Sequence, residues 1–315
     1  MFYRLSGVYH TRYQSDRALW PIPADRWQAI IVLALALLAP LAVSPLYLGS
    51  YLLPWLIWSA AALSLSLLMG LAGQLHFGFA AVMAIGAYTG IHMVRAGVPF
   101  ELALLGGGAA SALIGTAFGF AALRVKGLYL VMATLAMQYL VDWVIINVPA
   151  ISGGAQATLR APTPAVLGFP VETLAGRYYI ALAWVVLLSV FFLNVRRSSF
   201  GRALIAIRDK DFAAAVIGVD PFRYKLLAFL TASFMGGVTG ALLAFCYYGA
   251  VTPEQFSFNV SIQLVAMVLV GGLGSVIGSF FGAGFVLLAP IFLTNLVAAA
   301  GASGLLNVSQ NLIAH

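Results

Sequence analysis

Charged side chains are scarce in this sequence of 315 residues. Only 8% of the residues are Asp, Glu, Lys or Arg, whereas 63% belong to the apolar set. Soluble domains carry roughly 25% charged residues, and a water-facing surface cannot be built from so few charges. The composition therefore excludes an ordinary soluble domain and indicates that lipid is the solvent.

Cysteine and the common catalytic motifs are also lacking. Cys246 is the single cysteine, so no disulfide can form within the chain. The four histidines are scattered, and the sequence contains no phosphate-binding loop, paired-histidine motif or nucleophile elbow. We therefore expect no catalytic residue, no metal site and no cofactor bound by this chain, and the energy for any transport would come from other chains.

Apolar runs near membrane-spanning length recur along most of the sequence. A helix needs about 20 residues to cross ~30 Å of hydrocarbon. Residues 1–27 contain no apolar core of signal-peptide length and are interpreted as a cytoplasmic arm. We expect an all-α, polytopic membrane bundle in residues 28–315, with nine spans at 28–48, 52–69, 77–94, 102–123, 127–147, 178–195, 226–247, 259–273 and 276–296.

The distribution of basic residues predicts the orientation of this bundle. With a cytoplasmic N-terminus, thirteen of the sixteen Lys and Arg residues lie inside, and only Arg95, Arg160 and Arg177 lie outside. This follows the positive-inside rule. The same placement makes 148–177 a periplasmic loop and 196–225 a cytoplasmic segment. Because the basic residues separate apolar runs and form no single patch, we expect no nucleic acid partner.

A few polar side chains interrupt the apolar runs. Gln74 and His76 lie in the uncharged, glycine-rich stretch 70–90, whereas Gln138 and Asp142 lie one turn apart in a later span. The stretch is either a broken helix that lines a path or a tight hairpin with glycines for packing. Asp142 either lines the path or lies at the membrane interface. We predict that these four side chains lie near a common central path.

Glycines form two further patterns. In the outer loop, Gly153 and Gly154 either present backbone N–H groups to an anion or form a plain turn. Within the spans, small residues recur four positions apart, a spacing that lets helix backbones approach closely and predicts helix packing. These pairs and triplets are Gly86/Gly90, Gly115/Gly119, Gly236/Gly240 and Gly274/Gly278/Gly282.

The segment 196–225 contains an amphipathic stretch among basic residues. Residues 202–217 have helix-forming composition, and Gly218 followed by Asp220-Pro221 predicts the end of the helix. The stretch is either a short helix that contacts a cytoplasmic partner or an ordinary basic loop. The residues expected near one face of the helix are Ala203, Leu204, Ile207, Ala214 and Ile217.

Five separated stretches carry a family resemblance. They are GLAGQLHFGFAAVMAIGAYTG, LRVKGLYLVMATLAMQYLV, ISGGAQ, RSSFGRALIAIRDKDFAAAVIGVDPFRYKLLAF and LVGGLGSVIGSFFGA, in this order over roughly residues 50–285. The sequence resembles the permeases of the branched-chain amino acid type of ABC importers, in particular the longer of the two paired membrane subunits.

This resemblance implies a function and a set of partners. The chain would import a small polar solute, a branched-chain amino acid or a related carboxylate or amide, across a bacterial inner membrane. Its partners would be a second homologous permease, two cytoplasmic ATPases that use ATP and Mg, and a periplasmic solute-binding protein. Similar permeases dock a coupling helix on the ATPase, and the matching positions here are Arg208, Asp209, Asp211, Ala213, Ala214 and Gly218.

The sequence also departs from the family pattern. His76 stands where many members have Ser, and Tyr139 and Asp142 stand where Glu and Arg are common, which leaves the identity of the cargo open. Nine spans from a cytoplasmic N-terminus end in the periplasm, whereas the family pattern has ten, so we expect the encoded chain to continue beyond His315. The competing function is an ATPase-independent secondary transporter or channel, for which inverted repeats and several intramembrane ionisable residues are expected.

Overall fold

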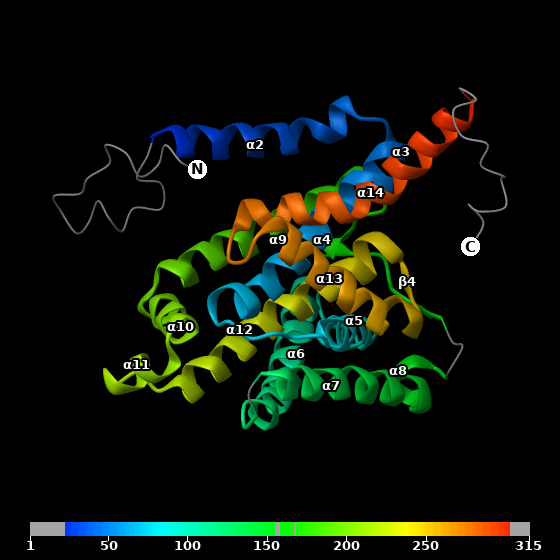
Figure 1. The fold of residues 1–315 in the computed structure, drawn as a ribbon. Helices are drawn as coiled ribbons and strands as arrows, with labels where there is room; N and C mark the ends of the chain where they lie inside the picture. Colours follow the sequence, from blue (N-terminus) through cyan, green and yellow to red (C-terminus); the bar gives the residue numbers. More distant parts are fainter. Residues whose placement is uncertain (1–22, 126, 155–157, 167, 303–315) are drawn as a thin grey trace.

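Long helices dominate the computed structural model, which describes residues 23–125, 127–154, 158–166 and 168–302. Nine helical bodies follow one another in this part of the chain (Figure 1). They are α2 (Pro23–Ala42), the continuous series α3 (Pro45–Tyr47), η2 (Leu48–Leu52), α4 (Leu53–Ser66) and η3 (Leu67–Leu71), α5 (Phe79–Arg95), α6 (Phe100–Ala122), α7 (Leu128–Asn147), α9 (Leu174–Arg197), α12 (Pro221–Leu242) continued by η4 (Leu243–Tyr248), α13 (Phe258–Gly271) and α14 (Val276–Ala302).

Shorter elements connect these bodies. α8 (Pro149–Ser152) follows α7, α10 (Ser199–Asp209) and α11 (Asp211–Val216) follow α9, and a 3-10 turn, η5 (Pro253–Phe256), precedes α13. Four two-residue strands form two antiparallel pairs. β1 (Leu159–Arg160) pairs with β4 (Ala250–Val251), and β2 (Ala165–Val166) pairs with β3 (Phe169–Pro170).

The predicted helical architecture is confirmed, and each predicted span falls mainly on one helical body. By length and composition, seven helices of the described chain could cross a membrane, while Ile30–Ala42 and Phe79–Arg95 are shorter apolar helices. The count of nine spans and the cytoplasmic N-terminus remain predictions. Most of the predicted arm and residues 303–315 lie outside the described residues, as does the expected tenth span.

The boundary between the first two spans differs from the prediction of 28–48 and 52–69. The first helix ends at Ala42, and the next helical body already begins at Pro45. Ser44 between them is extended, with a ψ of 151°. A residue that precedes proline is driven out of the helical region by the proline ring, so the break falls at Ser44.

The core forms where α4, α5, α6 and α12 meet. α4 is buried along nearly its whole length, and α12 packs against α4, α5 and α6. A Cβ atom on Gly86 of α5 would overlap the carbonyl oxygen of Gly237 on α12, and one on Gly240 would overlap that of Met83. The predicted packing role of these glycines is therefore confirmed: the backbones touch where a side chain would separate them.

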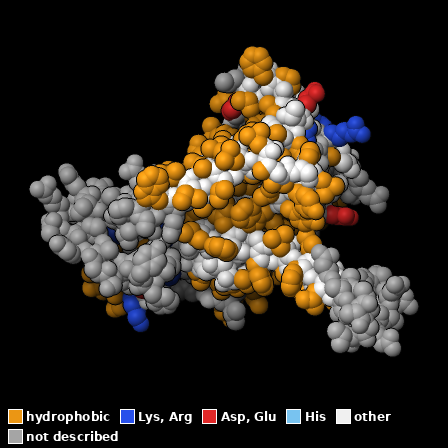
Figure 2. Space-filling model, turned by 90° about the horizontal axis from the view of Figure 1, so that it is seen from above, with side chains coloured by type: hydrophobic (Ala, Val, Ile, Leu, Met, Phe, Trp, Pro, Cys, Tyr) orange, Lys and Arg blue, Asp and Glu red, His pale blue; other side chains and the backbone are white. Residues whose placement is uncertain are grey.

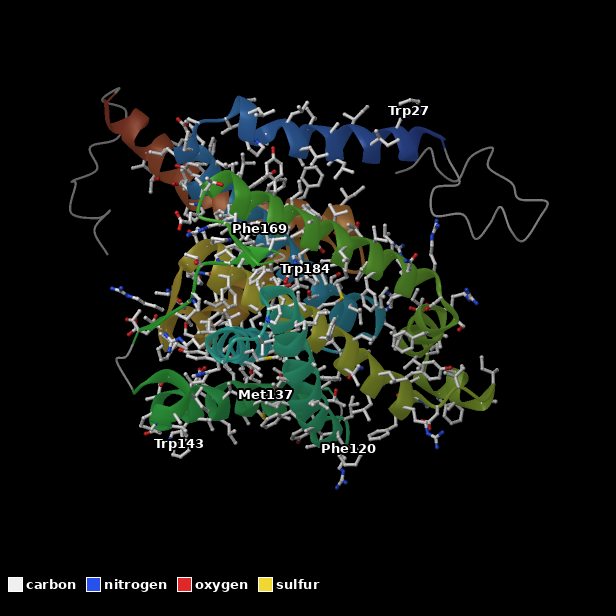
Figure 3. All side chains as sticks on the ribbon, turned by 180° about the vertical axis from the view of Figure 1, so that it is seen from behind. Trp27, Phe120, Met137, Trp143, Phe169 and Trp184 are labelled. Atoms are coloured by element: carbon white, nitrogen blue, oxygen red, sulfur yellow. The ribbon has the colours of Figure 1, made fainter. Side chains whose placement is uncertain are left out.

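The connecting segments gather at opposite ends of the bundle. α10 and α11 lie at one end, whereas β4 and α8 lie at the other, in Figure 1 and in the reverse view of Figure 3. Figure 2 shows a surface between these ends that is covered mainly by hydrophobic side chains. On the face shown in Figure 3, Trp143 and Phe120 are 62% and 45% exposed, whereas Met137 is buried.

Candidate functional site

Gln138 forms a polar junction at the centre of α7. Its Oε1 accepts hydrogen bonds from Ala81 N at 2.9 Å and Ser261 Oγ at 3.0 Å. Its Nε2 donates to Phe256 O at 2.8 Å and to Asp142 Oδ1 at 3.0 Å. An amide offers two donors and two acceptor lone pairs, so this buried side chain is fully satisfied. Gln138 thus joins α7 to α5, η5 and α13 and has no free group for a solute.

The segment between η3 and α5 is non-helical and mostly buried. Side chains of other helices hold the backbone here: Phe77 N donates to Thr134 Oγ1 at 3.2 Å, and Ala80 N, in the first turn of α5, donates to Ser261 Oγ at 2.9 Å. Irregular backbone at membrane depth is tolerated where protein satisfies it. A Cβ on Gly78 would overlap the carbonyl oxygen of Thr134, so the segment packs tightly on α7.

His76 and Gln74 are buried in this segment. The His76 ring lies between Phe79 and Phe229, with centroid distances of 5.7 and 5.6 Å. Its Nδ1 accepts from Gly78 N at 3.2 Å, which leaves the proton of the neutral ring on Nε2. Gln74 donates to Ala72 O at 3.2 Å. Both side chains thus bond within the segment, but His76 Nε2 is buried and has no hydrogen-bond partner among the described residues.

The structure brings two of the four predicted path residues into direct contact. Asp142 is bonded to Gln138, and it is only partly buried, whereas Gln74, His76 and Gln138 are buried. The chain segment next to His76 reaches α7 through Gly78 and Thr134. Asp142 is the one of the four that is partly exposed. That these four side chains lie near a common solute path stays a prediction.

Gly153 and Gly154 form a turn after α8. Both have positive φ angles, 88° and 123°. Gly153 N donates to Pro149 O at 2.7 Å, and Gly154 N donates to Ser152 Oγ at 3.1 Å. Because both N–H groups are used within the loop, the geometry favours the plain turn over an anion site.

The predicted coupling helix at 202–217 is wrong in one respect, because the stretch is divided into α10 and α11. Lys210 between them is extended, with φ −151° and ψ 93°. Asp211 then begins α11 and pairs with Lys225 of α12 at 3.3 Å. The predicted end is confirmed, since Gly218 follows α11 with a φ of 90°.

The two faces of α11 differ from the sequence prediction. Ala214 is buried against the bundle, at 2% exposure, whereas Ile217 is 74% exposed. Phe212 and Val216 are 84% and 72% exposed. We call Phe212, Val216 and Ile217 the α11 patch. Phe212 and Val216 were not predicted from the sequence, although they lie four residues apart, a spacing that places two side chains on one face of a helix.

Arg208 connects α10 to the end of η3. Its Nη1 donates to Gly70 O at 2.6 Å, and its Nε and Nη2 contact Asp209 Oδ1 at 3.2 and 3.1 Å. Gly70 in turn packs on the backbone of Gly274, whose N donates to Ser66 Oγ at 2.9 Å. The end of α10 therefore touches the helix that leads into the segment of Gln74 and His76.

Comparison with known proteins bears on the family to which the chain belongs. A family model described as the branched-chain amino acid transport system permease component matches residues 47–310. The high-affinity branched-chain amino acid transport system permease proteins LivM of Salmonella typhimurium and Escherichia coli are each 32% identical over 245 residues, which cover 70% of this chain and 57% of each relative. The probable ABC transporter permease protein YphD of Escherichia coli is 30% identical over 120 residues, 37% of this chain and 34% of that protein.

No solved structure is a significant match to the chain. The matched region spans little more than half the length of the two LivM relatives. Because the family model covers well over half of the 315 residues, however, it assigns the family. The chain belongs to the family of permease components of branched-chain amino acid transport systems.

Proposed function

We propose that the chain is a transmembrane permease subunit of an ATP-driven importer in the bacterial inner membrane. It would move a small polar solute, a branched-chain amino acid or a related carboxylate or amide, from the periplasm to the cytoplasm. It acts with a second homologous permease, two ATPases that use ATP and Mg, and a periplasmic solute-binding protein. The membership of the permease family and the seven candidate spans support this proposal.

The observation that carries the proposal is the α11 patch. Phe212 and Val216 are exposed on a helix of six residues, and Ile217 is exposed directly after it, at the end of the molecule that also carries Arg208 and Lys210. A helix this short is stable only through its contacts. Apolar side chains that are exposed to water outside the membrane are typical of a surface that binds a protein partner. The ATPase is the partner that an import complex places there.

Phe212, which the family resemblance did not predict, and the six predicted coupling residues have different proposed roles. Phe212 of the α11 patch would enter the ATPase, whereas Ala214 would hold α11 on the bundle. Asp211 would fix the start of α11 through Lys225, and Arg208 would connect α10 to Gly70. Ala213, Asp209 and Gly218 are exposed and lie beside these contacts.

Co-purification of the ATPases tests this proposal. The complex would be solubilised gently from cells that express the wild-type chain, the Phe212→Ser variant, or the Phe169→Ser variant. Phe169 is the matched control, because it is 77% exposed and lies on β3, outside the coupling segment. We expect the wild type and Phe169→Ser to retain two ATPase chains and Phe212→Ser to lose them. Equal recovery from all three would refute the docking role of the α11 patch.

A secondary transporter or channel is the competing function. It predicts solute uptake by the chain alone, driven by an ion gradient or by the solute gradient. Among the four predicted path residues, Asp142 is the single acid and His76 is the one other ionisable side chain. That supply of ionisable groups is small for ion coupling, and it favours the importer.

A further inference from the structure

A stripe of exposed side chains on α6 ends in an arginine. Leu113, Ala117, Phe120 and Arg124 are exposed and follow one another at intervals of four, three and four residues. This spacing places them on one face of a helix, and Arg124 lies just beyond the end of α6 at Ala122. The Arg124 guanidinium lies over the Phe120 ring, 5.1 Å from its centroid. This face of α6 is therefore apolar along its length and carries a positive charge at its end.

α12 carries a second stripe of the same form. Arg223, Leu227 and Leu230 are exposed at intervals of four and three residues, and Phe234 continues the spacing. A Cβ on Gly108 of α6 would lie 3.0 Å from Phe234 Cε2, so this face of α12 borders α6. Two neighbouring helices thus each present an apolar face that has an arginine at one end.

An aromatic contact joins the arginine ends of the two stripes. The Phe120 and Phe222 rings meet edge-on, with centroids 5.6 Å apart. Phe222 directly precedes Arg223, and Phe120 lies under Arg124, so both guanidinium groups belong to the same end of the bundle. Figure 3 shows Phe120 at the edge of the bundle. In the predicted orientation this end is the cytoplasmic one.

Both arginines retain N–H groups for an anion. Asp220 Oδ2 contacts Arg223 Nε at 3.0 Å, while Asp220 Oδ1 accepts from the backbone N–H groups of Phe222 and Arg223. The two terminal nitrogens of Arg223 lie outside this ion pair, and its side chain is 82% exposed. Arg124 forms no ion pair within the described chain. A guanidinium stacked on a ring still points its N–H groups outward, in its own plane. Arg124 is therefore the freer of the two cations.

The combination of charge and apolar surface selects the chemistry of a ligand. The apolar parts of both stripes lie on candidate membrane spans, Phe100–Ala122 and Pro221–Tyr248, so hydrocarbon is their solvent. A molecule that contacts these faces and the two arginines together must be amphipathic and anionic. Arginine recognises phosphate oxygens through paired N–H groups, and basic sites between helices at the cytoplasmic side bind anionic headgroups.

We propose that the surface formed by the two stripes, the α6–α12 surface, binds an anionic phospholipid. Its phosphate lies at Arg124 and Arg223, and an acyl chain lies along Leu113 and Leu227. This inference goes beyond the proposed import function and does not depend on it. It gives Arg223 no part in coupling, so loss of the lipid does not alter uptake per ATP hydrolysed.

Photo-crosslinking from within the α6–α12 surface tests this assignment. The complex would be assembled in vesicles of phosphatidylethanolamine with a minor share of phosphatidylglycerol, with p-benzoylphenylalanine in place of Leu113. Phe281 on α14 is the matched control position, because the two side chains are 72% and 74% exposed and α14 contains no Lys or Arg. Mass spectrometry of the illuminated complex identifies the molecule attached at each position.

We expect phosphatidylglycerol to be at least about fivefold enriched at position 113 over position 281, because one basic residue near an anionic headgroup contributes roughly that factor. Equal shares of the two lipids at both positions would overturn the assignment. Attachment mainly to another protein chain would overturn it too, since a partner would then cover this surface.

Charge variants locate the headgroup. Arg124→Ala should lower the enrichment by about fivefold, and Arg223→Ala should lower it less, because Asp220 already occupies part of that arginine. Arg124→Lys keeps the charge and should keep more of the enrichment than Arg124→Ala. An unchanged enrichment in Arg124→Ala would overturn the assignment.

Arg202→Ala is the control for net charge. Arg202 is exposed on α10, outside both stripes, and donates to Arg197 O at 2.8 Å. We expect its loss to leave the enrichment at position 113 unchanged. Equal effects of Arg202→Ala and Arg124→Ala would show that the lipid responds to total charge and that no local site exists.

Discussion

The guanidinium of Arg208 donates a 2.6 Å hydrogen bond to the backbone carbonyl oxygen of Gly70. Arg208 belongs to α10, whereas Gly70 belongs to η3 and lies 138 residues earlier in the chain. A Cβ on Gly73 would lie 2.7 Å from Arg208 Cγ, so the aliphatic part of the arginine packs there too. We therefore propose that Arg208 transmits movement of α10 and α11 to the segment that carries Gln74 and His76.

We predict that Arg208→Ala uncouples ATP hydrolysis from uptake. A hydrogen bond from a charged donor is worth about 1.5–3 kcal/mol. Its loss should lower uptake per ATP hydrolysed by roughly tenfold or more, while the subunits still assemble. Arg223→Ala is the control, because Arg223 is 82% exposed and pairs only with Asp220 at the surface. An unchanged transport ratio in Arg208→Ala would contradict this role.

Tyr178 compensates for a defect that Pro40 introduces into α2. Proline has no N–H, so the carbonyl of Ala36, four residues earlier, lacks its helical donor. The Tyr178 hydroxyl donates to Ala36 O at 3.0 Å, and the adjacent Tyr179 hydroxyl donates to Leu37 O at 3.1 Å. These bonds attach α2 to α9.

Tyr178→Phe should therefore destabilise the docking of α2, by about 0.6–1.7 kcal/mol for an interhelical hydrogen bond in a membrane. Pro40→Ala restores the helical donor, so the same Tyr178→Phe change should cost less in that background. Thermal unfolding of the four proteins in one double-mutant cycle measures the difference. Equal costs in both backgrounds would show that the tyrosine does not compensate for the proline.

Gln138→Met should be strongly destabilising although its volume is conserved. It leaves Ala81 N and Phe256 O without partners, at about 1–3 kcal/mol for each unsatisfied group. Leu140→Met, at a position with 50% exposure on the same helix, is expected to change stability by no more than about 0.5 kcal/mol. Thermal denaturation of the purified complexes compares the two. Similar unfolding midpoints for the two variants would mean that the hydrogen bonds of Gln138 contribute little to stability.

Gly218 offers a test of backbone strain at the end of α11. Its φ is 90°, and a Cβ there would meet nothing within 4 Å, so a substitution acts through the backbone alone. Gly218→Val should cost about 1–2 kcal/mol, whereas Gly218→Asn should cost less because asparagine visits this region more readily. We expect faster proteolysis of residues 211–220 and lower uptake in the valine variant. Equal proteolysis and equal uptake in the two variants would show that backbone strain at this turn affects neither stability nor transport.

The positions of the helices were predictable from the sequence because a long apolar run with so few charges is typical of a membrane-spanning helix. The structure departs from the predicted helix boundaries where a local interaction interrupts a stretch of helix-forming sequence. Pro45 ends the preceding helix early at Ser44, and Lys210 interrupts a stretch with good helical composition, since Asp211 pairs with Lys225 from a later helix.

The candidate site was harder to predict, because residue type does not say which way a side chain points. Gln138 and Gln263 are both glutamines in apolar spans, yet one is buried in a hydrogen-bonded junction and the other is exposed. The difference depends on the rotation of α13, which the bond from Ser261 to Gln138 sets. That contact joins residues 123 positions apart, and no local pattern encodes it.

ATP-dependent uptake in proteoliposomes tests the central claim most directly. The chain would be reconstituted with its partner permease and ATPases, with ATP inside the vesicles at the ATPase side and the binding protein and radiolabelled leucine, an amide or a dicarboxylate on the other. The account predicts uptake of at least one of these solutes, and uptake that needs ATP and the complete complex. Uptake by this chain alone, driven by an ion gradient and indifferent to ATP, would contradict it.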